Sequence, residues 1–144
     1  MLCVRKMFVY KQHKDRSIRI RSAITAIKAL LPLDLYPAHK MELLSTCIWK
    51  ITEADGKARV RYWSEGAIAN PKAKLQHEHV NQRQELVSRL VSGEEVENVV
   101  QDAVACMVTE PEHNLLGRTN SKGWERYKDS GIRVFDAKDQ KWCW

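Results

Sequence analysis

Apolar residues recur every three or four positions in four separate segments of the chain, and this spacing constrains the fold more than any other feature. Each pattern predicts a helix with one apolar face and one polar face. The first helix should end at Pro32 and the second before the turn dipeptide Asp55-Gly56, because neither sequence continues a helix. The predicted helices cover about residues 17–31, 37–54, 82–91 and 94–104.

Short segments between these helices have strand-like patterns. Residues 57–63 alternate apolar and polar side chains, which is typical of a half-buried strand, although a helix beginning near Ser64 could absorb its end. Residues 3–10 suit a short strand or an irregular start. Further short strands are expected over residues 75–80, 105–108 and 131–135. The pattern as a whole predicts an α+β fold dominated by helices, with a few short strands.

The length and the spacing of loop-forming residues indicate one domain over residues 1–144. A chain of 144 residues with 44% hydrophobic residues can enclose one ordinary core. Its four prolines are scattered singly, and it contains no linker rich in Pro, Gly or Ser and no internal repeat.

Cysteine usage and the first ten residues indicate a reducing, cytoplasmic location. Cys3, Cys47, Cys106 and Cys143 form no close pair, which argues against a zinc ribbon and a disulfide framework and favours free thiols, with one or two bridges left open. The charges of Arg5 and Lys6 interrupt the apolar run that a secretory signal needs. The longest apolar runs have a few residues, far short of the ~20 that cross a bilayer, so no membrane association is expected.

Positive charge is concentrated at the amino-terminal end, in residues 1–28. This region contains eight of the 24 Lys and Arg residues but one of the 18 Asp and Glu residues, so the net charge of +6 comes entirely from it. A dense basic surface attracts polyanions, which makes nucleic acid the leading partner class and an acidic protein the second. A solvated helix face that binds nothing is the alternative. The residues expected to contact nucleic acid are Arg5, Lys6, Lys11, Lys14, Arg16, Arg19 and Arg21.

The middle of the chain brings together residues that could carry chemistry. Glu78 and His79 lie on one predicted strand, and the strand predicted over 105–108 leads directly into a helix start. In that start, Thr109 and Glu112 have the spacing of a capping box, which places His113 in the first or second turn of a short helix.

This order of elements resembles the ββα-metal, or HNH, nuclease motif over about residues 77–116. The resemblance implies metal-dependent hydrolysis of phosphodiester bonds in nucleic acid. It assigns His79 as the general base and Glu78 and His113 as ligands of a divalent ion, Mg²⁺ or Mn²⁺ in preference to Zn²⁺. These roles suit the residue types, because imidazole titrates near neutrality and both carboxylate and imidazole bind divalent ions. The chain departs from the family pattern in placing two predicted helices between the strands and in lacking a Cys-x-x-Cys pair.

The strand geometry leaves other arrangements open. Neighbouring strand residues point to opposite faces, so Glu78 and His79 share a site only if the strand is bent or bulged. His77 and His79 would share one face and could bind a metal jointly, which makes His77 a further candidate ligand. A structural zinc held by His77, His79, Cys106 and His113, or histidines that merely bond to neighbouring backbone, are the alternatives.

Two other functions compete with the nuclease. One is a non-catalytic nucleic-acid-binding or regulatory protein that uses the basic amino-terminal face. The other is an inhibitor or adaptor that uses this face and the tail Lys141-Trp142-Cys143-Trp144 on an acidic protein. The tail is expected to fold back on its own domain in preference to binding a partner.

Overall fold

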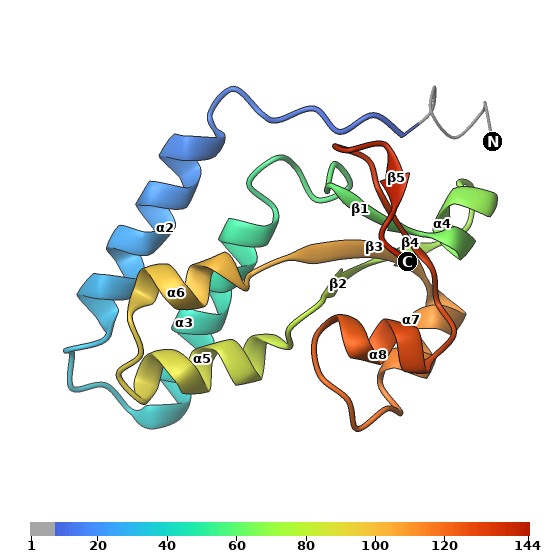
Figure 1. Cartoon of the computed structure of the whole chain (residues 1–144). Helices are drawn as coiled ribbons and strands as arrows, with labels where there is room; N and C mark the ends of the chain where they lie inside the picture. Colours follow the sequence, from blue (N-terminus) through green and yellow to red (C-terminus); the bar gives the residue numbers. More distant parts are fainter. Residues whose placement is uncertain (1–7) are drawn as a thin grey trace.

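The structure is a computed structural model that describes residues 8–144. These residues form seven helices and one five-stranded sheet (Figure 1). The predicted α+β fold with helices dominating is confirmed. One group of helices packs together at one end of the sheet, and a second, smaller group lies against one of its faces. None of the helices in this part of the chain is long and apolar enough to span a membrane.

Four helices form a layer with its own apolar core. α2 (Arg16–Leu30) and α3 (Pro37–Thr52) pack side by side, and α5 (Arg83–Val91) and α6 (Val96–Gln101) pack against them (Figure 1). The layer forms because the apolar faces of the helices pack against one another and are thereby removed from water. The buried cluster includes Ile27, Leu44, Ile48, Leu86, Leu90 and Val99.

The five strands form a mixed sheet in the order β2-β3-β1-β4-β5. β1 and β3 run parallel, and the other neighbouring strands run antiparallel. α4 (Glu65–Ala69) follows β1 directly, and the Ser64 hydroxyl caps it by accepting a hydrogen bond from the Ala67 amide at 3.0 Å. The strands are β1 (Tyr62–Ser64), β2 (Leu75–His79), β3 (Ala105–Thr109), β4 (Val134–Asp136) and β5 (Lys141–Trp142).

Helices α7 (Glu110–Leu116) and α8 (Trp124–Asp129) cover one face of the sheet. Leu116 and Tyr127 from these helices are buried against Cys106, Val108 and Val134 from the strands. The opposite face of β3 carries Ala105 and Met107, since successive strand residues alternate between faces.

The carboxy-terminal tail folds back on this domain, as expected. The ring of Trp142 lies 5.4 Å from that of Phe135, and the ring of Trp144 lies 5.6 Å from that of Trp124. The tail therefore completes the sheet edge and the adjoining core.

Several elements differ in extent from the prediction. The strand predicted over 57–63 forms only from Tyr62, because β3 and β4 supply pairing partners for Tyr62–Ser64 alone. The final predicted strand starts at Val134, and the helix predicted over 94–104 ends early. β5 was not predicted, because two residues leave no alternating pattern. Residues 8–10, the described part of the possible first strand, are irregular.

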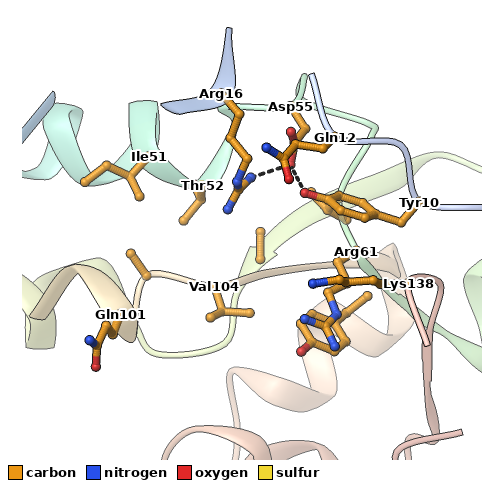
Figure 2. Close-up of a pocket in the computed structure, with 14 residues that line it drawn as sticks. Tyr10, Gln12, Arg16, Ile51, Thr52, Asp55, Arg61, Gln101, Val104 and Lys138 are labelled. Carbon is orange, nitrogen blue, oxygen red and sulfur yellow. Dashed lines mark hydrogen bonds and ion pairs between the residues drawn. The ribbon is translucent and has the colours of Figure 1, made fainter. Parts of the chain in front are cut away.

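A polar cleft of about 350 Å³ lies between the helical layer and the sheet (Figure 2). Arg16 at the start of α2 and Thr52 at the end of α3 line one side. Arg61, which precedes β1, and Ala105 at the start of β3 also line it.

Candidate active site

The candidate site is built on β2, β3 and α7, in the order that the sequence motif predicts. β2 pairs antiparallel with β3, which places Glu78 opposite Cys106 and His79 opposite Ala105. Although α5 and α6 occupy the chain between the two strands, the strands themselves are direct neighbours in the sheet. The strand pair is therefore formed despite the long helical excursion.

A capping box fixes the start of α7 at the end of β3. The Glu112 amide donates to the Thr109 hydroxyl at 3.3 Å, and the Glu112 carboxylate accepts from the Thr109 amide at 2.8 Å. The Ser64 hydroxyl donates to the same carboxylate at 2.6 Å. These bonds tie α7 to the end of β3, as the predicted capping box requires. The bond from Ser64 also ties α7 to the end of β1.

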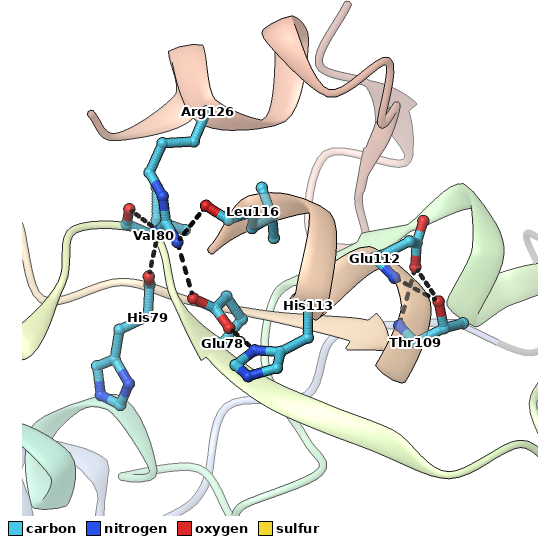
Figure 3. A network of polar contacts seen from close by, with 8 residues as sticks. All are labelled: Glu78, His79, Val80, Thr109, Glu112, His113, Leu116 and Arg126. Carbon is cyan, nitrogen blue, oxygen red and sulfur yellow. Dashed lines mark hydrogen bonds and ion pairs between the residues drawn. The ribbon is translucent and has the colours of Figure 1, made fainter. Parts of the chain in front are cut away.

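Glu78 and His113 meet on the face of the sheet that α7 covers. Nδ1 of His113 hydrogen-bonds a carboxylate oxygen of Glu78 (Figure 3). The Glu78 side chain is only 10% exposed, whereas that of His113 is 49% exposed. The pair therefore has a buried carboxylate and an imidazole that reaches solvent.

Buried Arg126 on α8 holds the other oxygen of Glu78. Its guanidinium donates to Glu78 Oε1 at 3.2 Å and to the backbone carbonyls of His79 and Val80 at 3.1 Å (Figure 3). It also donates to the Leu116 carbonyl at 3.4 Å, at the end of α7. Arg126 is 3% exposed, and these contacts offset part of the cost of burying its charge, although its Nε has no partner among the described residues. They also link β2, α7 and α8.

His79 points to the opposite face, so the expected meeting of Glu78, His79 and His113 does not occur. Nε2 of His79 lies 2.8 Å from the Thr52 hydroxyl on α3, and Nε2 of His77 lies 3.2 Å from the same oxygen. Regular alternation along β2 causes this division, because the strand has no bulge at Glu78. The two histidines share a face, as the spacing predicted.

Burial favours the neutral forms of the His77 and His79 imidazoles. It lowers the pKa of His79 to about 3, with nearby His77 and Arg83 acting in the same direction. Burial also lowers the pKa of His77, whose Nδ1 bonds the Lys57 carbonyl at 2.7 Å. The ring of Trp49 packs on both, at 5.0 and 5.2 Å between centroids. These contacts resemble those of core histidines.

Of the side chains expected to hold a metal, Glu78 and His113 meet each other but His77 does not join them. Both oxygens of Glu78 are engaged, one by Arg126 and one by His113, while His77 lies on the other face of β2. Within residues 8–144, no three His, Cys, Asp or Glu side chains are grouped so that they could hold an ion. As arranged, this donor set fits neither the divalent ion that the resemblance implies nor a structural zinc that includes Cys106.

The basic amino-terminal region uses part of its charge within the domain. Arg16 forms an ion pair with buried Asp55, Arg19 donates to the Ala54 carbonyl at 3.0 Å, and Lys28 pairs with Glu97. Lys11, Lys14 and Arg21 are exposed. Arg5 and Lys6 lie outside the described residues.

No local pattern in the sequence predicts Arg126 as part of this site. The contact joins residues 48 positions apart, and α8 is too short for its apolar spacing to indicate a buried face. Thr52, the shared partner of two histidines, was likewise missed, because a threonine at a helix end carries no distinctive pattern.

No family model, curated protein or solved structure matches this chain.

Proposed function

We propose that this protein hydrolyses phosphodiester bonds in nucleic acid at the exposed edge of the Glu78–His113 pair. The observation that carries the proposal is the contact between these two side chains on a β2-β3-α7 unit. That order of elements is the one the nuclease resemblance implies. The half-exposed imidazole is accessible to a polymer, which a sealed pocket would exclude.

The pair supplies acid–base chemistry through one ring nitrogen. A carboxylate oxygen only accepts hydrogen bonds, so Nδ1 of His113 donates to Glu78 and Nε2 is the nitrogen left to act as a base. Nε2 would take a proton from an attacking water as its oxygen bonds to phosphorus. The same proton would then pass to the leaving oxygen as the ester P–O bond breaks. Arg126 acts indirectly, by holding the carboxylate in place.

Positive charge close to α7 suits a phosphate substrate. Arg118 and Lys122 are exposed residues of the loop between α7 and α8, and Lys122 lies 3.7 Å from the carboxylate of Glu85. Cations beside a site raise the local concentration of nucleic acid. The more distant basic residues of α2 would extend the contact between the protein and a nucleic-acid strand.

Cleavage assays with a matched pair of histidine variants test this proposal. Labelled single- and double-stranded DNA and RNA are incubated with the protein in Mg²⁺, in Mn²⁺ and in EDTA. The wild type should cleave at least one substrate, and His113→Ala should lower the rate at least about 100-fold, since general acid–base catalysis contributes that much. His39→Ala is the control, because His39 is an exposed histidine near the start of α3.

The metal arms decide whether an ion takes part. Cleavage should persist in EDTA, because the donors as arranged do not fit a divalent ion. Dependence on Mg²⁺ or Mn²⁺ would instead indicate the ion that the resemblance implies. A folded wild type that cleaves none of the substrates, or a His113→Ala variant as active as His39→Ala, would refute the proposal.

A second candidate is nucleic-acid binding without cleavage. It is favoured by α2, which carries Arg16, Arg19, Arg21 and Lys28 and no acidic residue. Binding that weakens steeply with salt, in a wild type that cleaves nothing, would select this function.

A further inference from the structure

The cleft between the helical layer and the sheet is a second place where a ligand could bind. Neither Glu78 nor His113 lines it. Its volume of about 350 Å³ is within the usual range for small-molecule sites, and such sites commonly lie where two layers of structure meet. Figure 2 shows its charged side chains gathered from segments far apart in the sequence.

The one acidic side chain of the cleft is fully compensated. Asp55 accepts from the Tyr10 hydroxyl at 2.6 Å and from the His13 amide at 2.8 Å, and it forms an ion pair with Arg16 (Figure 2). Both of its oxygens are therefore occupied. The cleft offers a ligand no free carboxylate among its described residues.

Two guanidinium groups in the cleft are fixed in position and keep unused donors. Arg61 donates to Asp136 through Nε at 2.8 Å and Nη2 at 2.6 Å and to Asp139 through Nη2 at 3.2 Å, and no described residue bonds its Nη1. Arg16 uses Nη1 on Asp55, and its Nη2 is likewise unbonded within residues 8–144. Groups held in place in this way bind an anion at a lower cost in side-chain entropy.

Lys138 adds a third cation to the lining (Figure 2). Its side chain is exposed and forms no ion pair with the described residues. The side chains of Gln12, Thr52, Tyr62 and Gln101 complete the polar part of the lining. The cleft thus presents many hydrogen-bond donors and few free acceptors.

We propose that this cleft binds the phosphate group of a nucleotide or of a nucleic-acid end. Phosphate oxygens are acceptors that carry negative charge, which matches converging Arg and Lys donors. The Tyr10 ring in the lining provides a surface on which an attached base can pack.

Calorimetric titration tests the proposal with probes that differ only in the phosphate. The small-molecule arm compares adenosine 5′-monophosphate with adenosine. The strand arm compares 5′-phosphorylated with 5′-hydroxyl oligonucleotides on the His113→Ala variant, so that binding is measured without cleavage. At least one phosphorylated probe should bind at least about tenfold more tightly than its unphosphorylated counterpart. Which arm responds identifies the source of the phosphate.

Two variants assign the binding to the cleft. Lys138→Ala should weaken the phosphorylated probe about tenfold, and Gln101→Glu should weaken it further by adding a negative charge. Lys141→Ala is the control, because it removes the same charge from an exposed residue outside the lining. Equal affinity for both members of each probe pair, or equal losses in Lys138→Ala and Lys141→Ala, would overturn the proposal whether or not the protein is a nuclease.

Discussion

Alternation along β2 decides which of its polar residues can act together. Glu78 faces α7 and α8 and pairs with His113, whereas His77 and His79 face α3 and share Thr52. The sequence predicted this division as a geometric obstacle to joint action. It could not predict which face would be half-exposed, because that depends on helices far away in the sequence.

Buried His79 should make the protein sensitive to mild acid. Its pKa is about 3 in the folded state and near 6.5 when unfolded, so the unfolded chain binds the proton more tightly. The stabilisation that depends on neutral His79 is therefore fully present above pH 6.5 and is lost as the pH decreases toward 3. The free energy of unfolding should be about 2 kcal/mol lower at pH 5 than at pH 7. Urea denaturation at the two pH values measures this difference.

A His79→Gln variant provides the control for this effect. The glutamine cannot take up a proton, so most of the acid sensitivity should disappear, with His77 responsible for a remainder in the same direction. Equal pH dependence in wild type and variant would show that His79 is not the group concerned.

The elements were predicted with unequal success, and the reason lies in their length. α2 and α3 each show several repeats of the apolar spacing, and both occur where that spacing predicts them. The strand predicted over 57–63 was mostly wrong, because only Tyr62 and Trp63 of that range pair with neighbouring strands. The start of α7 was predicted well, since a capping box is a local signal that needs no distant partner.

Removing the cap of α7 should lower the stability of the protein. Thr109→Ala deletes the hydroxyl that accepts from the Glu112 amide, and it should lower the free energy of unfolding by about 1 kcal/mol. Thr109→Ser keeps that hydroxyl and should restore most of the loss. Thermal unfolding of the two variants checks this, and an alanine variant as stable as wild type would contradict the role of the cap.

The whole molecule assembles the site from three segments that the sequence keeps apart. Glu78 comes from β2, His113 from α7 and Arg126 from α8, and the last two helices cover the same face of the sheet. The sequence predicted β2, β3 and the histidine-bearing helix. It did not predict the order β2-β3-β1-β4-β5, because that order depends on pairings between distant segments.

The rate of the chemical step in Glu78→Gln distinguishes catalysis by the Glu78–His113 pair from catalysis by His113 alone. The amide oxygen can still accept from Arg126, which preserves the link between β2 and α8. Single-turnover cleavage should slow at least about tenfold, with unchanged substrate affinity and with Glu110→Gln, an exposed residue of α7, behaving as wild type. A Glu78→Gln protein that cleaves as fast as wild type would contradict the account.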